Sequence, residues 1–217
     1  MNWKRGAYVT LAALATSAAI GLGSAVVGGA VIGDNAAAQA GTAAGAKAAS
    51  FAIDLSHSSI VYKTTHMGVS NHWGRFNDFS GTYSFDPKNP AGASFDVTIK
   101  AESIDSGDKK RDGHLRTPDF FNAKEQATIT FKGAGATAGS AGAFELKGDL
   151  TLLGKTKPIT AKLVHIGEKD LGKMGYRSGV EATFTIKRSD FGMNYMVENG
   201  GIGDEVHITV SLEGVRQ

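Results

Sequence analysis

Strict alternation of apolar and polar residues is the feature that most constrains the fold of this chain. From Phe51 onward, short runs separated by turn residues place apolar side chains at every second position. The clearest runs are 60–66, 95–101, 144–152, 180–187 and 206–213. A period of two is typical of β-strands with one apolar and one solvated face. With 51–55 and 73–85 added, the pattern predicts about eight strands and little helix, which indicates an all-β, antiparallel sandwich or barrel.

Local signals refine this pattern. Residues 150–161 have the character of a tight hairpin whose glycine adopts a positive φ. A break in the alternation around Asn77-Asp78 predicts a β-bulge. The segment 106–115 is the one stretch with helical character, and it is short. Residues 133–142 contain only Gly, Ala, Ser and Thr, so we expect a loop there.

Composition and charge exclude several classes of protein. The 217 residues include no cysteine, which excludes disulfides, thiolate metal sites and cysteine nucleophiles. The net charge is only +2, so nucleic acid is not expected as a partner. The six histidines lack the spacing of ligand pairs, and we therefore expect no metal site and no required cofactor. Ser, His and Asp are present without a Gly-x-Ser-x-Gly elbow, so the sequence predicts no enzyme and no catalytic residue.

The N-terminal region predicts export to the periplasm. Lys4 and Arg5 precede an uncharged stretch, 6–33, and Ala38-Gln39-Ala40 fits the small-x-small rule for signal-peptide cleavage. An uncleaved membrane anchor is the alternative, because the uncharged stretch is longer than the roughly 7–15 residues of an ordinary signal core. The expected organisation is a signal peptide at 1–40, an Ala/Gly linker at 41–50 and a folded domain at 51–217.

The segment 111–132, RDGHLRTPDFFNAKEQATITFK, joins a polar loop or short helix to an aromatic pair and then to a strand. It resembles the signature of the YceI-like family of lipocalin-like, polyisoprenoid-binding proteins. Further stretches resemble the family in the same order: 51–87, 148–163, 184–195 and 203–214. The resemblance therefore extends over nearly all of the expected folded domain.

The resemblance implies a lipocalin-like antiparallel barrel of about eight strands with one short helix. It also implies an interior tunnel for a long-chain amphiphile, such as a polyisoprenoid or an isoprenoid quinone. The inward-facing residues expected to line this tunnel and bind the ligand are Tyr62, His66, Phe79, Phe95, Ile99, Phe131, Leu152, Leu163, His165, Phe184 and Ile186. The expected rim or lid consists of Arg111, His114, Arg116, Phe120, Phe121, Met193 and Tyr195.

Ordinary structural roles remain open for these residues. The apolar members could simply pack a solid core, and His66 and His165 could be hydrogen-bonded core histidines. Arg111 and Arg116 could hold the loop through pairs with Asp112, Asp119 or Asp190. The stretch 187–190 is expected to form an ion-paired corner.

The resulting hypothesis is an exported protein that sequesters or carries a long-chain isoprenoid lipid, with a polyisoprenoid or quinone tail inside the barrel. Its expected partners are the lipid, a membrane redox or lipid-handling protein, and a second copy in a homodimer. One alternative is a periplasmic stress-related or interaction protein with a filled barrel that acts through its loops. Another is a redox accessory protein that presents a quinone to a membrane partner.

Overall fold

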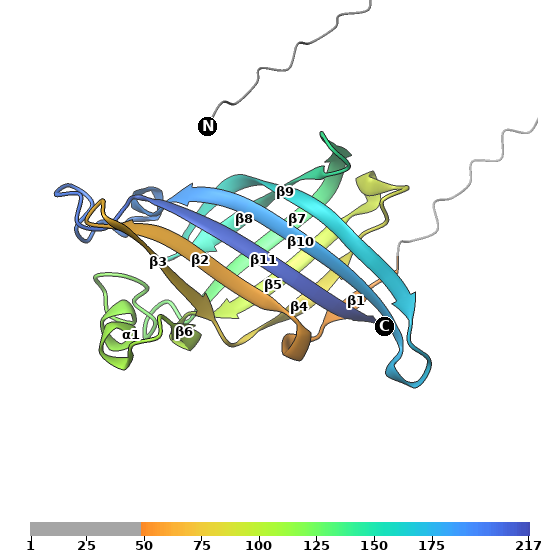
Figure 1. Cartoon of the computed structure of the whole chain (residues 1–217), viewed down its shortest axis with the longest axis horizontal. Coiled ribbons are helices and arrows are strands. Elements are labelled where there is room, and N and C mark those ends of the chain that lie inside the picture. Colours follow the sequence, from red (N-terminus) through yellow and green to blue (C-terminus); the bar gives the residue numbers. More distant parts are fainter. Residues whose placement is uncertain (1–48) are drawn as a thin grey trace, which may run out of the picture. The chain divides into compact units, whose positions relative to one another are not determined.

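The computed structural model describes residues 49–217, whose strands form one antiparallel sheet that closes on itself (Figure 1). The predicted leader at 1–40 and most of the predicted linker lie outside the described residues. Within the described part, no helix is both long and apolar enough to cross a bilayer. In chain order the elements are β1 (Phe51–Ile53), η1 (Leu55–His57), β2 (Ser59–His66), β3 (Ser70–Phe76), β4 (Phe79–Ser84), η2 (Pro90–Gly92), β5 (Ser94–Lys100), η3 (Ala101–Ser103), β6 (Ile104–Asp105), α1 (Lys109–Leu115), β7 (Thr128–Ala138), β8 (Phe144–Leu152), β9 (Lys155–Asp170), η4 (Gly172–Met174), β10 (Tyr176–Lys187), η5 (Arg188–Phe191) and β11 (Glu205–Arg216).

Closure of the barrel depends on β11. This strand pairs with β10 along its length, with β1 near its C-terminal end and with β2 further back. The closed ring runs β1-β4-β5-β7-β8-β9-β10-β11 and returns to β1. The wall continues beyond β11 through β2, β3 and β6, in that order. In the sequence, each of these strands directly precedes or follows a strand of the ring. The predicted all-β antiparallel barrel of eight strands with one short α-helix is therefore confirmed.

Three of the eight strands of the barrel are broken in the middle. Their two halves are β1 and β2, β3 and β4, and β5 and β6. The break between β3 and β4 falls at Asn77-Asp78, where the alternation predicted a bulge. Backbone hydrogen bonds still hold this kink, because Asn77 N donates to Ser103 O at 3.1 Å and Lys100 N donates to Asp78 O at 2.9 Å. The kink therefore keeps Asn77 N and Asp78 O paired where the regular ladder is interrupted.

The segment 133–142 corrects one sequence-based expectation, because it is mostly strand. β7 continues to Ala138, and Ala136 pairs with Leu146 across the ladder to β8. The turn that follows contains Ala141 and Gly142 at φ 53° and 74°. A run of small residues hides the alternation that marks the other strands, since Gly and Ala differ little in polarity.

The predicted hairpin at 150–161 is confirmed as the connection between β8 and β9. Leu153 and Gly154 form its two-residue turn at φ 52° and 71°. Two successive positive φ values match the twist of antiparallel strands, which is why this turn type is common in hairpins.

Aromatic side chains pack together where β1 pairs with the C-terminal end of β11, at the end of the barrel that carries the C-terminus in Figure 1. Tyr83 stacks on Phe51 with a centroid distance of 5.5 Å and on Phe95 at 5.6 Å. The Tyr83 hydroxyl donates to Ser178 O at 2.5 Å, and burial raises the pKa of Tyr83 to about 12. We call Phe51, Tyr83 and Phe95 the aromatic floor, because they block the interior at this end.

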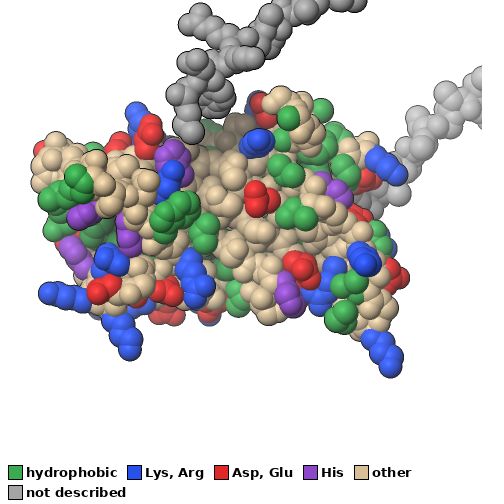
Figure 2. Space-filling view, viewed as in Figure 1, with side chains coloured by type: hydrophobic (Ala, Val, Ile, Leu, Met, Phe, Trp, Pro, Cys, Tyr) green, Lys and Arg blue, Asp and Glu red, His purple; other side chains and the backbone are tan. Residues whose placement is uncertain are grey.

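The opposite end carries the longer connections. Figure 1 places α1, the β2–β3 hairpin and the segment between β10 and β11 together there. On the face drawn in Figure 2, basic and acidic side chains are interspersed over the barrel. Val69 and Trp73 of the β2–β3 hairpin are 83% and 58% exposed, so this hairpin projects beyond the barrel wall.

Candidate functional site

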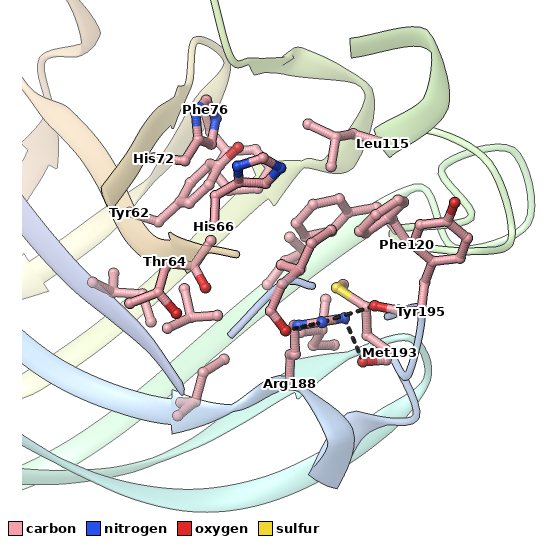
Figure 3. Close-up of a pocket in the computed structure, with 18 of the residues that line it drawn as sticks. Tyr62, Thr64, His66, His72, Phe76, Leu115, Phe120, Arg188, Met193 and Tyr195 are labelled. Carbon is pink, nitrogen blue, oxygen red and sulfur yellow. Dashed lines mark hydrogen bonds between the residues drawn. The ribbon is translucent and has the colours of Figure 1, made fainter. Parts of the chain in front are cut away.

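A cavity of about 550 Å³ lies inside the barrel at the end that carries α1 (Figure 3). Its volume falls within the roughly 300–1,000 Å³ of ordinary ligand sites. Strand residues form most of the wall, and α1, the segment after it and the β10–β11 connection line the top. The lining residues are Ile60, Tyr62, Thr64, Thr65, His66, Ser70, Asn71, His72, Phe76, Ile99, Arg111, His114, Leu115, Phe120, Phe121, Ile129, Leu150, Leu152, Phe184, Ile186, Arg188, Met193, Tyr195, Met196, Ile202, Val206 and Ile208.

Polarity changes along the axis of this cavity. The inward positions of β2 progress from Ile60 through Tyr62 and Thr64 to His66 at the hairpin end. Many of the remaining wall positions, on β5, β7, β8, β10 and β11, are apolar. The cavity is therefore amphipathic, with an apolar depth and a polar upper wall on β2 and β3.

A second cavity of about 70 Å³ extends the apolar depth toward the aromatic floor. All of its wall residues are apolar. It shares Ile60, Ile99, Leu150, Phe184 and Ile208 with the large cavity, so these side chains separate the two spaces. Small rotamer changes at this partition would lengthen the apolar space without disturbing the ladder.

A cluster of aromatic rings lies at the top of the large cavity. His114 meets Phe120 and Tyr195 edge-on at centroid distances of 5.0 Å each, and Phe120 lies 5.2 Å from Tyr195. We call these three residues the aromatic latch, because they join the α1 segment to the β10–β11 connection. Phe121 meets Phe76 of β3 edge-on at 5.5 Å and anchors the same segment to the barrel wall. Edge-to-face contacts of this kind are favourable beyond the area they bury.

Hydrogen bonds give α1 and its neighbours a fixed shape. Asp108 caps the helix by accepting from Arg111 N at 2.8 Å. The buried Asp112 carboxylate accepts from Ser106 N at 2.7 Å and from Ser106 Oγ at 2.5 Å. His114 Nε2 lies 2.8 Å from Asp119 Oδ2, which holds the imidazole in the latch. The lid is thus positioned by polar contacts and attached by aromatic ones.

The lid has two halves, α1 with the segment that follows it and the β10–β11 connection. Arg188 holds the second half in place. Its side chain is 3% exposed and donates to the carbonyl oxygens of Gly203, Met193, Tyr195 and Ile202 at 2.8–3.0 Å. Figure 3 shows the guanidinium beneath Met193 and Tyr195. Four charge-assisted hydrogen bonds to one segment fix the β10–β11 connection above the cavity. The sequence predicted an ion-paired corner at 187–190, and this prediction is wrong for Arg188. Its partners are backbone carbonyl oxygens.

Two polar atoms on the β2–β3 wall have no hydrogen-bond partner within the described residues. They are Tyr62 Oη and His72 Nε2, and each exposes less than 1 Å². Burial raises the pKa of Tyr62 and lowers the pKa of His72, so both groups are held in their uncharged forms. Figure 3 shows Tyr62, His66 and His72 grouped together, across the cavity from Phe120 and Tyr195.

Comparison with known proteins identifies the barrel. The YceI-like domain matches residues 51–214. The chain belongs to the YceI-like family. A UPF0312 protein of Pseudomonas aeruginosa is 41% identical over 178 residues, which cover 81% of this chain and 92% of that relative.

Solved structures share this YceI-like fold. The crystal structure of BcnA from Burkholderia cenocepacia has a TM-score of 0.67 and 26% identity, and the match covers 74% of this chain and 98% of that one. A polyisoprenoid binding domain from Saccharophagus degradans has a TM-score of 0.60 and covers 79% of this chain and 100% of that one. Its identity is 16%, so the likeness concerns the fold alone.

The YceI-like barrel distributes the residues expected to line a tunnel over three environments. Tyr62, His66, Ile99, Leu152, Phe184 and Ile186 line the large cavity. Phe95 and Phe131 line the small one, together with Ile99 and Phe184. Phe79, Leu163 and His165 line neither. Phe79 and Leu163 are buried in the core, and His165 packs against Phe85 at a centroid distance of 5.9 Å.

Of the expected rim residues, Arg116 alone does not line the large cavity. Its guanidinium donates to Glu102 O at 2.7 Å and to Ile104 O at 3.1 Å. Arg111 does line the cavity, and it donates to Ser106 Oγ at 3.0 Å and Ser106 O at 2.7 Å. Both arginines therefore hold the loop, as the structural alternative required, but through hydroxyl and carbonyl oxygens in place of the expected aspartates.

Several lining residues were not among the predicted ones. Ile60 and Thr64 share the phase of Tyr62 on β2, so alternation alone could have indicated them. His72 follows from the β2–β3 hairpin register, which places it opposite Thr64. Arg188 had no such signal, because a basic residue at a strand end ordinarily points to solvent.

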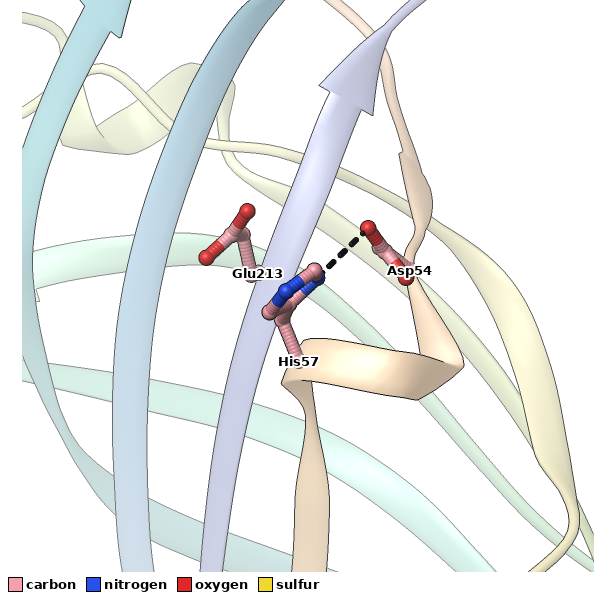
Figure 4. A group of neighbouring side chains, drawn as sticks. All are labelled: Asp54, His57 and Glu213. Atoms are coloured by element: carbon pink, nitrogen blue, oxygen red, sulfur yellow. Dashed lines mark hydrogen bonds and ion pairs between the residues drawn. The ribbon is translucent and has the colours of Figure 1, made fainter. Parts of the chain in front are cut away.

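One group of metal-type ligands occurs among the described residues, away from the cavity. Asp54, His57 and Glu213 bring their ligand atoms within 4.8 Å of one another (Figure 4). Arg177 Nη1 lies 2.5 Å from Asp54 Oδ2 and 2.6 Å from Glu213 Oε1, so a guanidinium already bridges the two carboxylates. Hydrogen bonds from Ser56, Arg177 and His57 hold the pKa of Asp54 well below its usual range. This group is an ion-paired network that ties the end of β1 to β10 and β11.

Proposed function

We propose that this YceI-like protein is an exported carrier that holds one long-chain isoprenoid lipid in its barrel. In this proposal the isoprenoid tail occupies the apolar depth, and the head group lies against the polar wall of β2 and β3. The observation that carries the proposal is the amphipathic cavity of about 550 Å³ between the lid and the aromatic floor.

The energetics of burial support a prenyl tail. Each buried CH₂ contributes about 0.8 kcal/mol. Several isoprene units in such a space can offset the roughly 4–15 kcal/mol that association costs in lost freedom. The walls at depth are apolar side chains such as Ile129, Leu150 and Phe184, which offer no competing hydrogen bonds.

Similar proteins support the same class of ligand. The Saccharophagus degradans domain of like fold is described as polyisoprenoid binding. The cavity walls suit a binding protein, since most of them are apolar and can cover a ligand tail. Export rests on the predicted leader at 1–40. A filled barrel acting through its loops agrees less well with an interior space of this volume.

Mass spectrometry of lipids extracted from the protein, purified natively from its own periplasm, tests the proposal. We expect close to one isoprenoid lipid per chain. The variant Ile186→Trp narrows the large cavity and should lower the lipid content. The control Ile166→Trp enlarges a side chain that is 62% exposed and should leave the content unchanged. A lipid-free wild type, or equal contents in both variants, would refute the proposal.

A further inference from the structure

From the two unpartnered atoms of the β2–β3 wall, we infer that Tyr62 and His72 form a subsite for an uncharged oxygen head group: a hydroxyl, a carbonyl or an amide. This inference deepens the proposed function and rests on it, because it assigns the head-group end of the same cavity. Both residues line the cavity, and neither Tyr62 Oη nor His72 Nε2 has a hydrogen-bond partner within the described residues.

The hairpin register brings the two side chains to one face. Thr64 lies opposite His72 and Tyr62 lies opposite Gly74, so Tyr62 and His72 are diagonal neighbours across the ladder. Their rings meet edge-on at a centroid distance of 6.4 Å. The two polar atoms therefore belong to one patch of wall.

The position of the Tyr62 ring depends on the absence of a side chain at Gly74. A Cβ built on Gly74 would overlap the Tyr62 hydroxyl and ring. Gly74 thus provides the space in which the phenol lies along the wall, and the phenol gains no hydrogen bond there. A buried polar group without a partner costs about 1–3 kcal/mol, and a ligand that supplies the partner recovers much of this cost.

The chemistry of the pair selects the class of head group. The Tyr62 hydroxyl donates to a ligand oxygen, while His72 Nε2 accepts from or donates to that ligand according to its tautomer. Both groups are uncharged and their polar atoms are buried, so they offer no counter-charge to an anion. The positive charge of Arg111 lowers the pKa of both Tyr62 and His72, and the negative charge of Asp112 raises them. The two charges therefore offset each other at the subsite. A diphosphate placed there would lose its hydration without full compensation.

Both side chains reach a ligand by small movements. The Tyr62 hydroxyl proton rotates about its C–O bond, and the terminal torsion of His72 is soft, so both groups can aim a hydrogen bond at a ligand without leaving their rotamers. His66 lines the same cavity, and its coulombic effect, after burial and the effect of Arg111, also lowers the pKa of His72. Leu115 and Phe121 from the α1 side line the same cavity as the subsite.

Competition binding to the full chain with three probes tests the assignment. Labelled geranylgeraniol is displaced by unlabelled geranylgeraniol, by geranylgeranyl diphosphate, or by the hydrocarbon of the same carbon skeleton. In the wild type the alcohol should bind more tightly than the other two. Tyr62→Phe and His72→Leu should each lower the affinity for the alcohol about fivefold, which corresponds to the loss of one hydrogen bond. The affinity for the hydrocarbon should stay unchanged. The control Tyr176→Phe removes a hydroxyl that bonds Glu168 outside the cavity and should change nothing.

The outcomes separate this inference from the function on which it rests. Unchanged affinity for the alcohol in both variants would overturn the subsite and leave the tail site standing. Tighter binding of the diphosphate, lost in Arg111→Gln, would also overturn it, because the head group would then be anionic. If none of the three probes binds, the proposed function fails and the subsite fails with it.

Discussion

His114 and Tyr195 meet edge-on at a centroid distance of 5.0 Å, although 81 positions separate them in the chain. One ring comes from α1 and the other from the β10–β11 connection, and Phe120 contacts both. This contact joins the two halves of the lid, and within residues 49–217 no strand pairing does so. We therefore expect these rings to control the release of a ligand at this end of the barrel.

The double variant Phe120→Ala/Phe121→Ala should speed lipid release about tenfold, because it removes the contacts of Phe120 with His114 and Tyr195 and the anchor of Phe121 on Phe76. The β-ladders do not depend on these rings, so circular dichroism should retain the strand signal. Lipid transfer to acceptor vesicles measures the rate. Tyr195→Phe keeps the ring and serves as the control. Unchanged release from the folded double variant would show that the segment is only a structural corner.

Arg188→Lys should destabilise the fold by about 3 kcal/mol, because a lysine cannot reproduce the planar fork that serves four carbonyl oxygens. Urea unfolding measures the loss. Lys187→Arg, next to it but exposed, is the matched control and should have little effect. A variant as stable as the wild type would mean that the β10–β11 connection is held by other contacts.

Gly74→Ala should lower the free energy of unfolding by about 1–3 kcal/mol, because the added Cβ overlaps the Tyr62 ring. The overlap disappears when the ring is absent. In the background Tyr62→Ala, the same substitution at Gly74 should therefore cost much less. A penalty of equal size in both backgrounds would place its cause in the β3 backbone.

Acid should weaken the network around Asp54. The pKa of Asp54 is depressed in the folded state, chiefly by the hydrogen bond from Ser56 and then by Arg177 and His57. A depressed carboxyl pKa stabilises the fold above the unfolded value of about 3.9, and this stabilisation is lost as pH falls through the folded pKa.

The variant Asp54→Asn should therefore be less stable than the wild type near neutral pH, and the difference should shrink below about pH 4. Chemical unfolding across this range gives the comparison. Asp149→Asn, which removes an exposed carboxylate outside the network, should show a difference that does not depend on pH in this way. A constant deficit in Asp54→Asn would exclude the linkage.

Alternation was enough to predict the class of fold, because each half-buried strand carries its own period-two pattern. It failed at 133–138, where Gly and Ala conceal the phase, and it did not distinguish wall from packed core. Phe79 and Leu163 share the inward phase of Phe184, yet only Phe184 meets open space. That difference depends on how side-chain volumes match across the closed barrel, which is a property of the whole ring.

The polar parts of the site were least predictable. Arg188 lies at a strand end, where charge is ordinary, and its four acceptors lie up to 15 positions away in the chain. His72 becomes relevant only when the β2–β3 register places it beside Tyr62. Such contacts depend on tertiary pairing that no local pattern encodes.

Photo-crosslinking with an isoprenoid alcohol that carries a diazirine at its tail end tests the central claim most directly. After irradiation of the loaded protein, peptide mass spectrometry maps the labelled residues. The account predicts labels on wall residues of the apolar depth, such as Ile129, Leu150 and Phe184, and their loss on competition with unlabelled lipid. Labels confined to exposed apolar residues, such as Val69 and Ile166, would contradict a ligand held inside the barrel.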